Sequence, residues 1–337
     1  MWDGEYPDEI YRLYAGPHQR ARPKSDFAKG AAGGRVSVRA EQEGKFLAFL
    51  RAEVGTPLFL KDDRSLGSDD PDIERMRAML HQHDEPGRRD QLQRLVILEL
   101  EVTLRRVNEF LTGLTLGGQA DGSSTSNALY MDVLLKMVNS TSSEVETNLD
   151  SLRERIREVS LVAPEHEKYG LMPPLDFDEF TRLLNRATGP ELQSLVQRVF
   201  EPYVSSLEGR LAALKDAYST LDALVPTLNS FFEGKSVEFS PRNGLEILAK
   251  GGGALPVASL SSGERHLLAL LLNTLLARKE SRLFLIDEPE LSLGVDWQRR
   301  IIRALMELTQ GTVVQFVVAT HSIEIVTSEP EALVRLE

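Results

Sequence analysis

The chain of 337 residues is 42% hydrophobic and 27% charged, which is enough material for one large globular domain or two smaller ones. Its formal net charge of -12 disfavours a general electrostatic grip on nucleic acid, because phosphate binding depends on clustered Lys and Arg. The sequence contains no cysteine, which excludes disulfides, thiolate metal sites and cysteine nucleophiles. It has no apolar run long enough to span a bilayer, and its acidic start is unlike a secretion signal, so we expect a cytoplasmic protein with no membrane partner.

The first segment with a distinct composition lies between Arg20 and Arg39 and carries six basic residues, one acid and the run Gly30–Gly34. We interpret it as a solvated loop rather than a nucleic-acid contact, because charged glycine-rich runs usually stay mobile. Short strand-like pieces occur at Arg35–Val38 and Pro57–Leu60.

Helix is predicted for the middle of the chain. From Leu100 the apolar residues step by four and three, which places them on one face of a helix. The Gly, Ser, Thr and Asn residues of Gly117–Asn127 predict a loop that ends this helix. A second helix is predicted over Ala128–Val138 and a charged one over Ser143–Val162. The apolar face of the helix that begins near Leu100 consists of Leu100, Leu104, Val107, Leu111 and Leu114.

The segment Gly170–Pro174 predicts a break, and Gly189-Pro190 predicts the start of the last long helix. That helix carries an apolar seam with the same spacing, which we expect to pack within the chain rather than against a partner helix. After Phe232 the apolar residues alternate, which predicts two strands across a turn at Arg242–Gly244. The seam consists of Leu207, Leu211, Leu214, Tyr218, Leu221 and Val225, and the alternating residues are Val237, Phe239, Leu245, Ile247 and Leu248.

The rest of the chain alternates between helix and strand. This alternation is typical of a parallel sheet with packed helices and predicts an α/β fold. The predicted elements are helix Glu264–Arg278, strand Leu283–Ile286, helix Asp296–Leu308 and strand Val313–Val318.

Four short motifs occur in this last part of the chain. The first, Leu260–Glu264, is by itself a capping box, in which the Ser261 side chain accepts from the backbone near Glu264 and Glu264 reaches back. For an isolated motif this structural interpretation is the more frequent one. The same helix start can also bind phosphate oxygens, because the backbone N–H groups of a first helical turn have no partner within the helix and the serine side chain is a small hydroxyl.

The second motif is the apolar strand that ends in the adjacent carboxylates Asp287 and Glu288. Ligands of parallel sheets gather at the carboxyl ends of strands. Adjacent residues on an extended chain point in different directions, so one acid can hold Mg²⁺ while the other orients or deprotonates an attacking water. An exposed acidic turn after a strand is the structural alternative.

The third and fourth motifs are a polar loop and a strand end. The loop Pro289–Gln298 runs into a helix with Asp296 as its predicted cap, or is a plain strand-to-helix connection. The strand Val313–Val318 delivers His321. A single His at a strand end is more often structural than catalytic, because imidazole serves readily as a local donor and acceptor.

Together the four motifs resemble the signature motif, Walker B strand, D-loop and H-switch of the ABC ATPase superfamily, in that order. The stretch Asp287–Leu293, followed by Trp297-Gln298, is most similar to soluble predicted AAA/ABC ATPases related to RecF, SMC and OLD proteins, whereas transporter subunits usually continue Asp-Glu-Pro-Thr. The resemblance implies an ABC-type ATPase sheet with packed helices and a large helical insertion. It implies residues 1–70 as a remnant of the amino-terminal lobe, 71–232 as the insertion with a helical hairpin, and 233–337 as the carboxyl-terminal lobe.

The resemblance also implies roles for single residues. Asp287 would help hold Mg²⁺, Glu288 would polarise the hydrolytic water, and His321 would contact the γ-phosphate of ATP. The helix start would bind the nucleotide of a second head, identical or different, and the loop would communicate across the dimer, although Gly294 stands where relatives usually have His. We therefore expect the acidic pair, the imidazole and the helix start to gather at one rim of the sheet. The implied nucleotide-binding residues are Ser261, Ser262, Gly263, Glu264, Ser292 and Asp296.

The larger departure is that the sequence contains no G-x-x-x-x-G-K-[ST] phosphate loop. Gly234-Lys235-Ser236 lacks the leading glycine and precedes a strand-like pattern, and Gly44-Lys45 lacks the following Ser or Thr. Three explanations remain: the chain starts downstream of the loop, a partner supplies the loop, or the head no longer hydrolyses ATP. Retention of Asp287, Glu288 and His321 favours the first two.

The leading hypothesis is an ATP-dependent head that dimerises around nucleotide and switches a DNA-repair, chromosome-handling or phage-defence complex. ATP and Mg²⁺ would be its cofactors, and its partners would include a second head, an effector such as a nuclease, and DNA. The alternative is a non-hydrolysing head that serves as an interaction subunit. A transporter ATPase is a third hypothesis, which Asp287-Glu-Pro-Glu290 disfavours.

Overall fold

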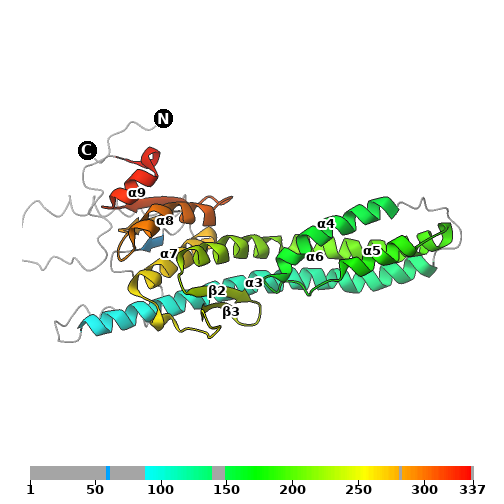
Figure 1. The fold of residues 1–337 in the computed structure, drawn as a ribbon, viewed down its shortest axis with the longest axis horizontal. Helices are drawn as coiled ribbons and strands as arrows, with labels where there is room; N and C mark the ends of the chain where they lie inside the picture. The colour runs from blue at the N-terminus through cyan, green and yellow to red at the C-terminus, as the bar shows by residue number, and fades with distance from the viewer. Residues whose placement is uncertain (1–57, 61–87, 139–148, 281–282, 335–337) are drawn as a thin grey trace, which may run out of the picture. The chain divides into compact units, whose positions relative to one another are not determined.

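A computed structural model describes residues 58–60, 88–138, 149–280 and 283–334, all within the unit Glu53–Glu337 (Figure 1). The strand predicted at Arg35–Val38 and the basic glycine-rich segment lie outside the described residues. In the part of the chain that is described, no helix combines the length and the apolar character needed to cross a membrane.

Within the described residues, three parallel strands form a sheet in the order β1-β4-β5, and helices connect and cover them. The predicted α/β class is therefore confirmed. The apolar sequence of β4 explains its central place, because Phe284 and Ile286 are 0% and 2% exposed. The elements of this region are β1 (Leu58–Leu60), α7 (Ser262–Glu280), β4 (Leu283–Asp287), α8 (Val295–Leu308) and β5 (Gln315–Ala319).

The long helices α3 (Arg88–Val138) and α6 (Pro190–Phe231) lie side by side along their predicted apolar faces (Figure 1). Leu111 of α3 is 1% exposed, and Leu214 and Leu221 of α6 are 0% exposed. The prediction that the seam of α6 packs within the chain is confirmed.

The loop predicted at Gly117–Asn127 is wrong, because α3 continues through it to Val138. Gly118 shows the reason. A Cβ atom at this position would lie 2.8 Å from the carbonyl oxygen of Ala213 and 2.8 Å from Cδ2 of Leu214, both in α6. Glycine here allows the two helices to approach closely and does not end the helix.

A matched pair of substitutions tests this contact. At Gly117 a Cβ would meet no described atom within 4 Å, so Gly117→Ala should stabilise the protein by about 0.5–1 kcal/mol through helix propensity. Gly118→Ala should instead cost about 1–3 kcal/mol, because α6 must move. Urea unfolding measures both. Equal effects of the two substitutions would show that α3 and α6 do not approach at Gly118.

Helix α4 (Leu149–Glu167) ends at the predicted break. Gly170 has a φ of 66°; its N–H donates to the carbonyl of Glu167 at 2.8 Å, and the following N–H donates to the carbonyl of His166 at 3.0 Å. This helix end requires a residue in the left-handed backbone conformation, which glycine adopts without strain. The break at Gly170–Pro174 and the start of α6 after it are both confirmed. Other elements of the described part of the chain are α5 (Phe177–Arg186), η2 (Val257–Ser259), α9 (Ile323–Ser328) and η3 (Pro330–Ala332).

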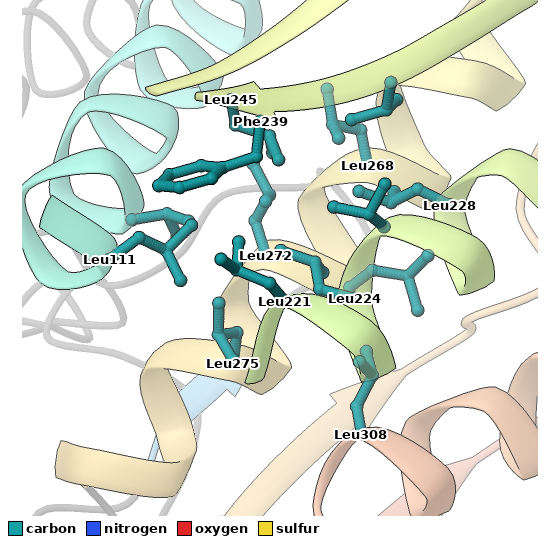
Figure 2. Packing of buried hydrophobic residues seen from close by; sticks show 14 of the residues in the cluster. Leu111, Leu221, Leu224, Leu228, Phe239, Leu245, Leu268, Leu272, Leu275 and Leu308 are labelled. Atoms are coloured by element: carbon teal, nitrogen blue, oxygen red, sulfur yellow. The ribbon is translucent and has the colours of Figure 1, made fainter. Parts of the chain in front are cut away.

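The strands β2 (Lys235–Ser240) and β3 (Gly244–Ala249) form the predicted antiparallel hairpin. Asn108 of α3 anchors it, because its side-chain oxygen accepts from the N–H of Leu245 at 2.8 Å. Figure 2 shows Phe239 and Leu245 beside leucines of α3, α6 and α7 in the interior. The long helices, the hairpin and the sheet therefore share one apolar core.

Candidate functional site

The predicted acidic pair and His321 lie at the ends of neighbouring parallel strands, Asp287 as the last residue of β4 and the other two just beyond β4 and β5. Asp287 is opposite Ala319 in the register of β4 and β5, and the N–H of Glu288 donates to the carbonyl of Ala319 at 2.8 Å. The two strands therefore end side by side, and the residues after them share one rim of the sheet. Glu288 has a φ of 47°, a left-handed conformation that turns the chain sharply after the strand.

His321 lies beside this pair. Its Nε2 is 3.8 Å from Oε1 of Glu288, which is longer than a hydrogen bond and becomes an ion pair only when the imidazole is protonated. The side chain of His321 is 90% exposed and that of Glu288 is 34% exposed, so a ligand arriving from solvent can reach both. The structure thus places Asp287, Glu288 and His321 at one rim.

The helix start Ser261–Glu264 forms the capping box that its sequence predicts. The N–H of Ser261 donates to Oε2 of Glu264 at 2.7 Å, and the N–H of Glu264 donates to the hydroxyl of Ser261 at 3.3 Å. Ser261 and Ser262 are exposed, whereas Gly263 and Glu264 are buried. The motif therefore has its structural role, and it leaves two exposed serines at the start of α7.

Lys235 forms an ion pair with the helix start, a contact that the sequence does not predict. Its Nζ lies 2.6 Å from Oε1 of Glu264. Burial raises the pKa of Glu264, but the hydrogen bonds from Lys235 and Ser261 and the charge of Lys235 outweigh burial, so the pKa lies below its ordinary value. Lys235 is thus engaged by Glu264 and begins a strand, as expected for a segment that is not a phosphate loop.

The helix start contacts the loop after the acidic pair. A Cβ atom at Gly263 would lie 2.5 Å from the carbonyl oxygen of Ser292, so only glycine allows α7 to come this close. Nε2 of His266 lies 3.0 Å from the carbonyl oxygen of Pro289. The expected gathering at one rim is therefore realised by the acidic pair and His321, whereas the helix start is joined to them through the loop.

The predicted cap at Asp296 is wrong. Helix α8 begins at Val295, and the extended Gly294 precedes it as the N-cap. The carbonyl of Gly294 accepts from the N–H groups of Trp297 and Gln298 at 2.9 and 3.0 Å. Asp296 therefore lies inside the first turn, with its side chain 90% exposed, where its charge favours the positive end of the helix dipole.

One side chain of the loop, Glu290, and one of α8, Gln298, hold the segment that follows β5. Glu290 accepts hydrogen bonds from the hydroxyl of Thr320 and from the N–H of His321, both at 2.7 Å. The side-chain oxygen of Gln298 accepts from the hydroxyl of Ser322 at 2.7 Å. No local spacing in the sequence predicts this role of Glu290, because its partners lie in another segment.

The described residues contain no group of three or more His, Asp or Glu side chains that could hold a metal ion by itself. Asp287 offers one carboxylate at the rim. In nucleotide sites Mg²⁺ is usually bound by one or two carboxylates together with substrate phosphates and water. The donor set at the rim therefore fits Mg²⁺ that binds together with a nucleotide.

A family model and a curated relative are similar to this chain. The model is described as "AAA domain, putative AbiEii toxin, Type IV TA system" and matches residues 59–327. The relative is a DNA double-strand break repair Rad50 ATPase from Sulfurisphaera tokodaii, 28% identical over 121 residues. That stretch is 35% of this chain and only 14% of the Rad50 protein.

Solved structures of SMC heads are also similar to this chain, with lower sequence identity than the Rad50 protein. The SMC head domain from Thermotoga maritima has 23% identity and a TM-score of 0.26, over 36% of this chain and 44% of that chain. An SMC head with an extended coiled coil, bound to the C-terminal domain of ScpA and derived from Pyrococcus furiosus, has 16% identity and a TM-score of 0.29, over 77% of this chain and 56% of that chain. Scores this low establish no common arrangement of the elements.

Proposed function

The chain belongs to the AAA-domain family described as "AAA domain, putative AbiEii toxin, Type IV TA system", and from this premise we propose that it is an ABC-type ATPase head that dimerises around nucleotide. One observation carries the proposal. The parallel strands β4 and β5 end side by side, and Oε1 of Glu288 lies 3.8 Å from Nε2 of His321 at that rim. Carboxylates and an exposed imidazole at the carboxyl ends of parallel strands suit phosphoryl chemistry.

Each residue of the rim receives one task. Asp287 would hold Mg²⁺ directly or through water, and Glu288 would orient and deprotonate the water that attacks ATP. His321 would contact the γ-phosphate. ATP bound with Mg²⁺ supplies the phosphoryl group and the leaving group, while the protein supplies position and charge.

The remaining predicted residues would serve the second head of the dimer. The exposed serines at the start of α7 suit the phosphates of a nucleotide held by that head, since they carry hydroxyl groups at a helix N-terminus, where the helix dipole favours anions. The loop that touches Gly263 is exposed at Ser292 and would meet the second head beside it. Of the six predicted residues, Ser261, Ser262, Ser292 and Asp296 are exposed and would face the second head, whereas Gly263 and Glu264 are buried and would hold the helix start in place.

The proposal requires a phosphate loop from another segment or chain, because the printed sequence has none. Strand β5 offers a place for it. Among the described strands β5 is an outer one that pairs with β4, and Val317 at its middle is 51% exposed. The outer edge of a parallel strand presents backbone groups that can pair with a further strand. A strand that ends in a phosphate loop would there lie next to His321.

The biological setting that we propose is DNA repair, chromosome handling or phage defence, with DNA and an effector such as a nuclease as partners. The support is the similarity to a DNA double-strand break repair Rad50 ATPase and the family description. A second candidate is a head that binds partners and does not hydrolyse ATP, which the missing phosphate loop favours.

An ATPase assay separates these two functions. The complex that the tagged chain forms in its native cells would be isolated and assayed for Mg²⁺-dependent release of phosphate from ATP. The proposal expects turnover by the complex and much less by the chain purified alone, because only the complex contains a phosphate loop. A complex that retains its partners but neither binds nor hydrolyses ATP would establish the second candidate.

A further inference from the structure

Glu290 connects the loop after β4 with the segment after β5. One oxygen of its carboxylate accepts from the hydroxyl of Thr320 and the other accepts from the N–H of His321, each at 2.7 Å. The hydroxyl of Thr320 in turn accepts from the N–H of Ser322 at 3.0 Å. A single carboxylate therefore fixes the backbone immediately before and at His321.

The imidazole of His321 depends on this anchoring. Its side chain is 90% exposed, so its position follows from its backbone rather than from packing. Hydrogen bonds to a carboxylate are roughly twice as strong as neutral ones, and two of them from one group also fix direction. The N–H of His321 thus points at Glu290 while its side chain extends toward Glu288.

We propose that Glu290 is a positioning residue, which holds the backbone of His321 so that the imidazole meets the γ-phosphate of bound ATP. This role rests on the proposed function, because it requires a nucleotide at the rim. Glu290 itself touches neither nucleotide nor water in this arrangement and acts through His321. Its short distance along the chain from Glu288 also ties the position of the imidazole to the loop that carries Ser292.

Selective labelling tests the contact without any assay of activity. The chain has six histidines, so protein labelled with ¹⁵N-histidine shows at most six backbone amide signals, and His321→Gln identifies that of His321. We expect Glu290→Ala to move this signal and to accelerate its hydrogen exchange. Glu290→Gln keeps one acceptor oxygen and should give an intermediate result. An unchanged His321 signal in Glu290→Ala overturns the proposal.

Glu324→Ala is the matched control. Glu324 lies just beyond His321 in α9 and accepts from Nε of Arg299 at 2.6 Å, an equally short contact that does not involve the N–H of His321. This substitution should leave the His321 signal in place. A shift as large as that of Glu290→Ala would show that any loss of charge near α9 moves the signal, which overturns the specific role of Glu290.

Kinetics of the native complex then test whether Glu290 supports ATP hydrolysis through His321. We expect Glu290→Ala to lower kcat by about 10- to 100-fold with a smaller change in KM, because a misplaced group costs mainly the chemical step. In a His321→Ala background the same substitution should change kcat by less than about twofold. Additive losses overturn the positioning role. A wild-type complex without ATPase activity refutes the proposed function instead, and the amide signal still decides the contact.

Discussion

Glu288→Gln should lower the kcat of ATP hydrolysis by about 10²–10⁴-fold while ATP still binds. The amide has nearly the shape of the carboxylate but cannot accept the proton of the attacking water. The turn after β4 should persist, because the bond from the N–H of Glu288 to the carbonyl of Ala319 belongs to the backbone. Phosphate release by the native complex measures kcat, and equilibrium dialysis with labelled ATP measures binding.

The same variant should also change assembly. The proposed dimer is held together by bound ATP, so hydrolysis should separate the two heads, and Glu288→Gln with ATP should accumulate as a dimer that light scattering detects. Glu331→Gln is the control, since Glu331 is an exposed carboxylate in η3, and it should behave as wild type. Hydrolysis by Glu288→Gln at the wild-type rate would show that Glu288 is not the base.

Periodic patterns predicted the elements whose neighbours are set by their own apolar faces. The four-and-three spacing in α6 leads directly to Leu214 and Leu221, which are fully buried, and the apolar run in β4 leads to its central place in the sheet. The prediction failed at Gly117–Asn127, where composition indicates a loop. There the deciding contact is between Gly118 and Ala213, which is distant in the chain and invisible to local reasoning.

The candidate site also contains residues that local sequence patterns predict and residues that they do not. The sequence predicts Asp287, Glu288 and His321 because each lies at or just beyond the end of a strand, and parallel strands in one sheet end at the same rim. No local pattern predicts the groups that hold this rim and the helix start, because Glu290 meets His321 and Lys235 meets Glu264 only after folding. The cap at Asp296 failed for a local reason, since the helix begins one residue earlier and Gly294 takes the cap position.

Leu221→Ala should destabilise the protein by about 2–5 kcal/mol, because Leu221 is 0% exposed and the surrounding helices cannot close the cavity. It belongs to the cluster that joins α3 and α6 to α7, β4 and the hairpin. Figure 2 shows Leu221 beside leucines of α6 and α7. Leu161→Ala is the control, at a side chain that is 65% exposed on α4, and should change stability by less than about 0.5 kcal/mol.

Two probes in the same urea titration show which parts of the protein are destabilised by Leu221→Ala. Circular dichroism follows the helices, and the fluorescence of Trp297, in a Trp2→Phe background, follows the region around Gly263 and α8. Because the proposed insertion, residues 71–232, and the proposed lobe, residues 233–337, share one apolar core, both transitions should shift together in Leu221→Ala. A shift confined to circular dichroism would instead show that the two proposed domains unfold independently, with a boundary near Phe232.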